Sequence, residues 1–222
     1  MSPRILVINP NSNAEVTAAI DRAMAPLRTA DAPAIDCITL TDGPPGIESQ
    51  RSCDLAAALV SEHIAATSDE ADAFVVACYS DPGVSASREV TAKPIFGAAE
   101  SAMATAASLG VRAGVISILD VAVARHWRHA RSVMLAPFVV ADLPIGLPVS
   151  ELADEVQCRA RMLDVGRRLK EAHGAEAIIL GCAGMARYRA ALEAELGVVV
   201  IDPTQAAAAM AISALRLGYR AG

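Results

Sequence analysis

The sequence predicts an α/β protein with two four-stranded parallel sheets, one in each of two similar halves related by a pseudo-two-fold axis. Short β-branched or apolar runs alternate with longer helical stretches along the whole chain, a pattern typical of βαβ units. Hydrophobic residues make up 54% of the chain but aromatic residues only 3%, as expected for Ala-rich helices packed on Val- and Ile-rich strands. Features of the first half also return in the second half in the same order.

The individual elements follow from local patterns along the chain. The runs expected to form strands are 4–9, 35–40, 72–78, 94–96, 112–118, 137–141, 176–181 and 198–201. Helices are expected between them, where capping signals enclose a helical stretch. These signals are a capping box of Ser12 and Glu15 before 13–26, Gly110 after 98–109, Ser150 and Gly174 at the two ends of a long helix, and Asp202 with Pro203 before 203–220.

Four segments of the first half have counterparts in the second half. The pairs are 4–11 with 112–119, Gly43-Pro44-Pro45 with Gly146-Leu147-Pro148, 72–80 with 176–184, and 94–96 with 198–201. Four matches in one order at a nearly constant separation indicate two copies of one α/β unit. We expect one lobe from 1–97 together with 203–222 and a second lobe from 98–202, with the last helix packed back on the first lobe.

Two of the five cysteines occupy matched positions. Cys78 follows the apolar run 73–77 and Cys182 follows 177–180, so each lies at the carboxyl end of a strand, where ligands bind in open parallel sheets. Backbone N–H groups and the positive end of a helix dipole are expected there, and these lower a thiol pKa toward neutrality. A cleft between the halves would place the thiols on opposite sides of a substrate, so that one removes a proton and the other returns one.

A cysteine at a strand end is often only a small buried hydrophobic residue. The matched positions of Cys78 and Cys182 favour catalysis instead, whereas the remaining cysteines have no counterpart and are expected to be structural. Those three are Cys37, Cys53 and Cys158. Polar side chains that follow the first strand of each half are expected to contact substrate, and these are Asn9, Asn11 and Ser117.

Charge and composition exclude several classes of function. The formal net charge of −6 and a pI near 5.2 argue against nucleic acid and anionic membranes as partners, which leaves a small molecule. The odd number of cysteines and the lack of a C-x-x-C pair argue against a disulfide framework and a zinc site. No signal peptide or membrane-spanning run is recognisable, so we expect a cytoplasmic protein.

Other candidate sites are weaker. No nucleotide-binding glycine motif occurs, and the only lysines, Lys93 and Lys170, make a pyridoxal phosphate Schiff base improbable. The basic segment 125–131 is interpreted as a surface or subunit-contact helix. A cysteine hydrolase needs a histidine beside its nucleophile, and His63 and His173 fall within or at the end of helices, so that class is disfavoured.

Taken together, the motifs resemble those of the Asp/Glu/hydantoin racemase superfamily, and within it the hydantoin and allantoin racemases. The segments that carry the resemblance are 8–12 (INPNS), 43–48 (GPPGIE), 77–83 (ACYSDPG) and 180–185 (LGCAGM). The resemblance implies two Rossmann-like lobes with the active site in the cleft between them, no cofactor, and a homo-oligomer. It also implies Cys78 and Cys182 as the proton-transfer pair and a 5-substituted hydantoin or allantoin as substrate.

Candidate substrate contacts follow from the same resemblance. They are Asn9, Asn11, Ile47, Tyr79, Ser80, Val84, Ser117, Ile118, Ala183 and Gly184. The sequence departs from the hydantoin pattern at two places, because Tyr79-Ser80 stand where Phe-Gly is usual and Ser117-Ile118 stand where Thr-Thr is usual. The free-amino-acid branch typically has Asn-Thr after the first cysteine and Thr-His after the second, and this chain has neither pair.

Three alternatives stay open, an aspartate or glutamate racemase, a maleate isomerase and a non-catalytic binding module. Both families of enzymes share the fold, and maleate isomerases use one cysteine as a nucleophile. Arylmalonate decarboxylases keep only the second cysteine, so Cys78 argues against that reaction. A non-catalytic small-molecule binding module is the alternative of another class, and it predicts ligand binding without turnover.

Overall fold

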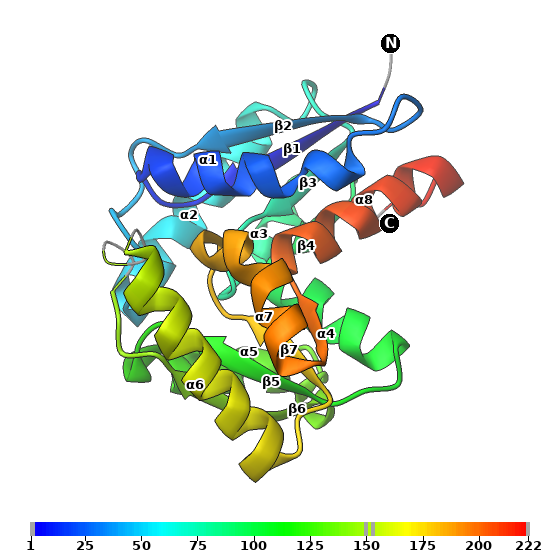
Figure 1. Ribbon diagram of the computed structural model, residues 1–222. Coiled ribbons are helices and arrows are strands. Elements are labelled where there is room, and N and C mark those ends of the chain that lie inside the picture. The colour runs from blue at the N-terminus through cyan, green and yellow to red at the C-terminus, as the bar shows by residue number, and fades with distance from the viewer. Residues whose placement is uncertain (1–2, 149–150, 152–153, 221–222) are drawn as a thin grey trace.

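The computed structural model describes residues 3–148, 151 and 154–220. The strands form two parallel sheets with equivalent orders, β2-β1-β3-β4 and β6-β5-β7-β8 (Figure 1). Their bounds are β1 Arg4–Asn9, β2 Ala34–Thr39, β3 Ala73–Val76, β4 Ile95–Gly97, β5 Ala113–Ser117, β6 Val139–Pro144, β7 Ala177–Leu180 and β8 Val199–Ile201. The predicted α/β class with two four-stranded parallel sheets is confirmed.

Helices follow most of the strands, as expected for parallel sheets. The described α-helices are α1 Ala14–Ala23, α2 Gln50–Ala66, α3 Val84–Ser87, α4 Ala98–Ser108, α5 Asp120–Ser132, α6 Glu155–His173, α7 Arg189–Leu196 and α8 Pro203–Leu217. The short 3₁₀ segments are η1 Ala25–Leu27, η2 Ala136–Phe138 and η4 Ala183–Tyr188. Among the described residues, no helix is long and apolar enough to cross a membrane.

Two predicted helix starts are wrong. Asn13, not Ser12, caps α1, because its side chain accepts a hydrogen bond from the Glu15 N–H while the Ser12 N–H donates to Pro44 O. The long helix α6 begins at Glu155 behind the cap Asp154, and Ser150 lies outside the described residues. A side-chain oxygen caps a helix only where the backbone before it is extended, and sequence spacing alone does not show that position.

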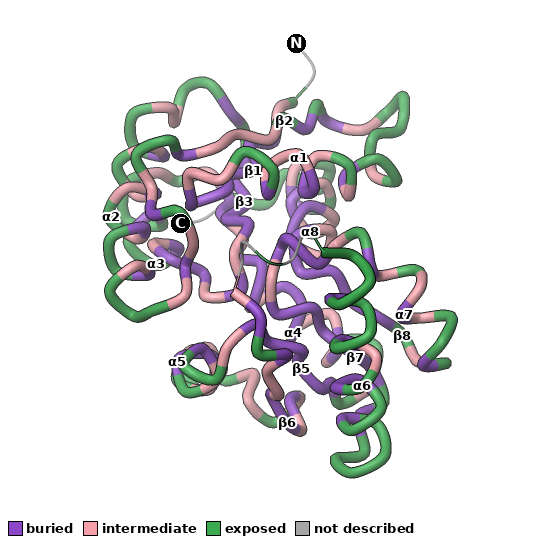
Figure 2. Tube along the Cα trace, turned by 60° about the vertical axis from the view of Figure 1, so that its left-hand side comes forward, coloured by how far each residue is buried: buried purple, intermediate pink, exposed green. Residues whose placement is uncertain are grey.

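Both sheets are covered on their two faces, and the central strands β1, β3, β5 and β7 are buried while the outer sides of the helices are exposed (Figure 2). Such double coverage explains why β3 and β7 are uninterrupted apolar runs. Helix α8 lies against β1, β3 and β4 of the first sheet and against α4, and its Gln205 side chain donates to Ala23 O (2.7 Å). The division into lobes at 97 and 203 stays a prediction.

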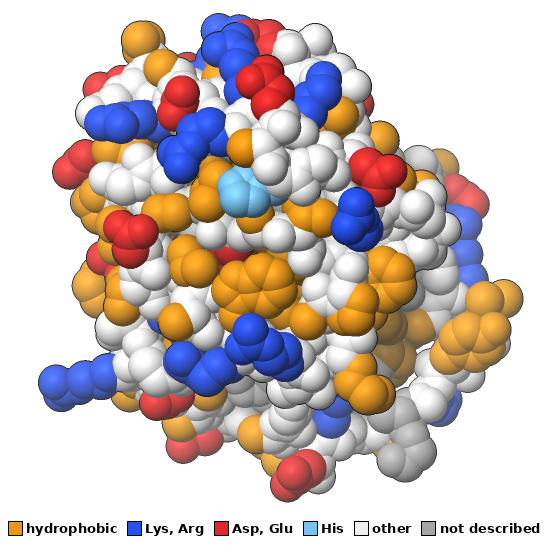
Figure 3. All heavy atoms as spheres, turned by 90° about the horizontal axis from the view of Figure 1, so that it is seen from below, with side chains coloured by type: hydrophobic (Ala, Val, Ile, Leu, Met, Phe, Trp, Pro, Cys, Tyr) orange, Lys and Arg blue, Asp and Glu red, His pale blue; other side chains and the backbone are white. Residues whose placement is uncertain are grey.

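The surface agrees with a chain that carries a modest net negative charge. On the face drawn in Figure 3, acidic and basic side chains are interspersed, with hydrophobic side chains between them. No single sign of charge forms an extended patch on that face.

Candidate active site

The two matched cysteines follow β3 and β7 at the same position. Ile8 of β1 pairs with Val76 of β3, Ile116 of β5 pairs with Leu180 of β7, and each cysteine stands two residues beyond its strand. Each cysteine carbonyl accepts a hydrogen bond from the N–H three residues later, Asp81 for Cys78 (2.9 Å) and Met185 for Cys182 (3.0 Å).

Each sulfur also has a backbone N–H beside it, that of Ser80 for Cys78 and that of Gly184 for Cys182. The two thiols therefore have nearly the same backbone surroundings. This similarity extends the duplication from the strands to the loops that carry the sulfurs.

Both sulfurs line one small cavity between the halves, with a volume of about 30 Å³. The first half contributes the residues around the end of β3 together with parts of the loops after β1 and β2. The second half contributes α5 and the loops after β5 and β7. The lining residues are Asn11, Val16, Ile47, Ala77, Cys78, Tyr79, Ser80, Ile118, Ala122, Arg125, His126, Gly181, Cys182 and Ala183.

The predicted lowering of the thiol pKa values is wrong. Burial raises the pKa of Cys78 to about 12 and that of Cys182 to about 11, although the neighbouring N–H groups lower both. Burial dominates because removing water disfavours the charged thiolate. The helix dipole expected after Cys78 is small, since α3 has only four residues and starts at Val84.

The interpretation of segment 125–131 as a surface helix is also wrong in part. Helix α5 exposes Arg128 but buries Arg125 and His126, each 6% exposed, in the wall of the cavity. With Ala122 and His129 these residues follow the i, i+3, i+4, i+7 spacing of one helix face. That spacing is the signal in the sequence for a shared face of the helix, and the structure places His126 in the same cavity as the two cysteines.

His126 is held by a buried carboxylate. Its Nδ1 lies 2.8 Å from Asp142 Oδ2 and 3.1 Å from the Ser117 hydroxyl, which donates to Asp142 Oδ1. A carboxylate only accepts hydrogen bonds, so Nδ1 carries the proton that it shares with Asp142. The ring also meets Tyr79 edge to face, with the centroids 4.9 Å apart.

Helix α5 also holds the loop after Cys78. Arg125 Nε donates to the Ser80 hydroxyl (3.0 Å), and His129 Nε2 lies 2.8 Å from Asp81 Oδ2. The Asp81 carboxylate accepts the first free N–H groups of α4, those of Ala99 and Glu100, at 2.8 Å each. These contacts stabilise Asp81 in the left-handed region (φ +44°), which non-glycine residues rarely adopt.

Residues 5–211 of this chain match the family of proteins described as Asp/Glu/Hydantoin racemase. The chain belongs to this family. It is therefore an isomerase of the racemase type that acts on small molecules, and the predicted resemblance is confirmed.

Named relatives cover nearly the whole of this racemase-family chain. A hydantoin racemase of a Pseudomonas species is 35% identical over 221 residues, which is 98% of this chain and 88% of that protein. The structure of allantoin racemase from Klebsiella pneumoniae is 34% identical, covers 100% of this chain and 91% of that one, and has a TM-score of 0.90. The structure of allantoin racemase from Pseudomonas fluorescens is 28% identical, covers 99% and 93%, and has a TM-score of 0.94.

The structure gathers most of the candidate substrate contacts of this racemase at the cavity, but not all of them. Those in the lining are Asn11, Ile47, Tyr79, Ser80, Ile118 and Ala183, and those outside it are Asn9, Val84, Ser117 and Gly184. Ser117 binds Asp142 as described, Val84 packs in the apolar core of the first sheet, and Gly184 faces Cys182 through its N–H.

Asn9 is fully buried, and its amide donates to the Asn11 side chain, to Asn13 O and to the Thr17 hydroxyl. It holds the turn after β1 and does not face the cavity. The other cysteines differ in place as well. Cys37 lies on β2, and Cys158 is a buried residue of α6. Cys53 is buried beside Ile47, and Cys78 packs against the cluster that these two residues belong to.

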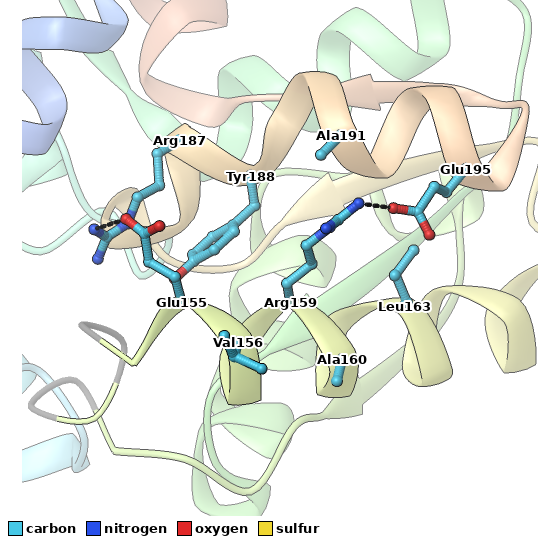
Figure 4. Close-up of a pocket in the computed structure, with 9 residues that line it drawn as sticks. All are labelled: Glu155, Val156, Arg159, Ala160, Leu163, Arg187, Tyr188, Ala191 and Glu195. Carbon is cyan, nitrogen blue, oxygen red and sulfur yellow. Dashed lines mark hydrogen bonds and ion pairs between the residues drawn. The ribbon is translucent and has the colours of Figure 1, made fainter.

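A larger groove of about 610 Å³ lies elsewhere, between α6 and the segment formed by η4 and α7 (Figure 4). Two ion pairs cross it, Arg187 with Glu155 at 3.1 Å and Arg159 with Glu195, and the Tyr188 side chain points into it. The groove contains neither thiol, so its size does not make it the catalytic site. Across the described ranges, no three His, Cys, Asp or Glu side chains are placed to hold a metal ion.

Proposed function

We propose that the chain is a cofactor-independent racemase that uses Cys78 and Cys182 as two bases on the acidic carbon of a hydantoin-like ring. The observation that carries this proposal is the matched pair of thiols, one from each sheet, in one cavity and with the same backbone donors. Symmetry-related loops present their sulfurs to a shared ligand from two sides, and racemisation needs one base on each face of the carbon.

In the proposed reaction one cysteine acts as a thiolate and removes the proton from the ring carbon next to the carbonyl. The electron pair of the broken C–H bond moves into the carbonyl, which becomes an enolate oxygen. The other cysteine, as a thiol, then donates its proton to the opposite face of the carbon, and the carbonyl re-forms. The protonation states of the two sulfurs are exchanged, so this form acts on the opposite enantiomer until the sulfurs exchange protons with solvent and the starting state is restored.

The raised thiol pKa values fit this chemistry in one respect and oppose it in another. A base with a pKa of about 11 is strong enough to accept a proton from a weakly acidic carbon, because proton transfer is favourable when the two pKa values approach each other. The same burial makes the thiolate scarce at neutral pH. A substrate ring would also need the cleft to widen, since a cavity of about 30 Å³ is far below the roughly 300–1,000 Å³ of typical ligand sites.

The choice of ring rests on the named relatives, which are hydantoin and allantoin racemases. In both rings a hydrogen stands on a carbon between a carbonyl and a nitrogen, which makes it acidic. The cavity wall is mostly apolar apart from α5, Asn11 and Ser80, which suits a neutral ring. Self-association of the chain stays a prediction.

The test uses single enantiomers of a 5-substituted hydantoin and of allantoin in deuterated water. Optical rotation and deuterium at the chiral carbon are followed, with spontaneous exchange subtracted by means of heat-inactivated protein. We expect rotation to decay to zero while one deuterium enters each molecule. Binding without either change contradicts the racemase proposal and supports a binding module, and the appearance of a cis-trans isomer from maleate supports nucleophilic thiol chemistry instead.

A further inference from the structure

Arg125 is a charged residue in the wall of the cavity whose hydrogen-bond partners are both uncharged. Its side chain is buried, with 6% of the residue exposed. Its hydrogen-bond partners are neutral oxygens, the Ser80 hydroxyl at 3.0 Å and Ile47 O at 3.4 Å. Within the described part of the chain, no carboxylate oxygen lies within 4.0 Å, the limit for an ion pair, of a guanidinium nitrogen of Arg125.

The arginines that form ion pairs in this chain differ from Arg125 in both exposure and partners. Each is substantially exposed and lies against an aspartate or glutamate. They are Arg4, Arg28, Arg88, Arg159, Arg187, Arg189 and Arg216. A guanidinium taken out of water is costly unless an anion offsets the lost hydration. The one arginine that is buried among the described residues, Arg125, has no such anion as an ion-pair partner.

The geometry of Arg125 leaves donors for a ligand. A guanidinium carries five N–H groups in a planar fork, and two of those of Arg125 are accounted for. The remaining N–H groups match the two oxygens of a carboxylate, which binds a guanidinium through two parallel hydrogen bonds. His126, fixed through Asp142, stands beside Arg125 in the same wall, so α5 contributes the basic side chains of the lining.

We propose that Arg125 binds a carboxylate of the substrate, so that the preferred substrates are hydantoin-like rings whose 5-substituent ends in a carboxylate. This inference rests on the proposed function, and it adds the class of substituent. The buried charge of Arg125 is permanent, so an anion already present in the bound substrate offsets it throughout the cycle. An enolate oxygen exists only during proton transfer and does not offset it in the ground state.

The experiment compares two hydantoins of nearly equal shape, 5-(2-carboxyethyl)hydantoin and its amide, 5-(2-carbamoylethyl)hydantoin. The wild-type protein is expected to racemise the acid with a kcat/KM about 100-fold higher than that of the amide, mainly through KM. Arg125→Gln should remove this preference, so that the acid-to-amide ratio of kcat/KM falls toward one. Arg125→Lys, which keeps the charge, should retain part of it.

Arg128→Gln is the matched control. Arg128 lies on the same helix but is exposed and hydrogen-bonds Gln50 at 2.8 Å outside the cavity, so this variant should keep the wild-type preference. A wild-type ratio near one overturns the inference. So does an equal fall of kcat for both compounds in Arg125→Gln, because that result assigns Arg125 to the enolate.

Failure of the proposed reaction is separable from failure of this inference. If neither hydantoin is racemised, calorimetric binding of the two compounds to wild-type protein and Arg125→Gln still tests the carboxylate contact. Tighter binding of the acid, lost in Arg125→Gln and kept in Arg128→Gln, supports it. Equal binding of the acid and the amide overturns it.

Discussion

In each half, hydrogen bonds between side chains stabilise the end of the first strand. The two networks join equivalent elements, but the chemical groups differ. In the first half, Asn9 of β1 binds Thr17 of α1, which binds Thr39 of β2, and all three groups are neutral. In the second half, Ser117 of β5 and His126 of α5 bind Asp142 of β6. Each network joins the first strand, first helix and second strand of its half.

The two halves share the positions of their thiols but differ in the charge that they contribute to the cavity wall. The positions of the thiols follow from strand register and backbone hydrogen bonds, which the halves share. The charged wall of the cavity comes from α5 alone, because the corresponding helix α1 contributes Val16 to the lining and no charged residue. The shared backbone therefore sets the positions of the two thiols, and the unshared side chains set the charge of the cavity wall.

The largest expected effect tests the equivalence of the thiols. Cys78→Ser and Cys182→Ser should each lower racemisation by about 10³-fold or more, because a hydroxyl is a far weaker acid than a thiol and supplies almost no anion to act as the base. Each variant should still exchange deuterium into one enantiomer, and the two variants should act on opposite enantiomers. Cys37→Ser, on β2 outside the cavity, is the control. Exchange of both enantiomers at equal rates by one variant contradicts the assignment of one base to each face.

The next effect concerns pH. The pKa values of both thiols are raised, to about 12 and about 11, so the thiolate that acts as the base is a minor species at neutral pH. Its fraction, and with it kcat/KM, should rise about tenfold per pH unit up to about pH 10. A hydantoin methylated at its acidic ring nitrogen should be used, so that only the protein titrates. A plateau near pH 7 would show that a thiolate is stabilised despite burial.

A smaller effect compares the two strand-end networks directly. Asp142→Asn removes a buried charge that holds both Ser117 and His126, and it should lower the free energy of unfolding by about 1.5–3 kcal/mol. Thr39→Val removes a neutral partner from the matching place and should cost about 0.5–1.5 kcal/mol. Urea unfolding of both variants measures the difference. Equal losses would mean that the charge of Asp142 adds nothing to stability.

The smallest effect concerns the residue before each cysteine. Ala77 and Gly181 make equivalent hydrogen bonds, to Ile8 O (2.9 Å) and Ile116 O (2.8 Å), but a Cβ on Gly181 would meet Ile116 O at 2.6 Å. Gly181→Ala should therefore lower the free energy of unfolding by about 1–3 kcal/mol, and Ala77→Gly by about 0.5–1 kcal/mol. Thermal unfolding of both variants is the measurement. A neutral Gly181→Ala would show that the second loop can shift to the geometry of the first.

Much of this protein could be predicted from its sequence. The order of the eight strands and the match of Cys78 with Cys182 are local or repeated patterns, since apolar runs, helix caps such as Asp202 and the duplicated segments lie within short stretches of chain. Strand positions depend chiefly on such stretches because side-chain periodicity is a property of the segment itself.

Other features were decided only by the tertiary structure. Arg125 and His126 face the cavity because α5 packs across the loops of the other half, and the pattern of α5 alone does not say which partner covers its polar face. Asn9 is turned away from the cavity by Thr17, and the thiol pKa values rise because elements from both halves exclude water from the sulfurs. The sequence by itself determined where the two thiols stand, and packing between distant segments decided their basicity and the charge that faces them.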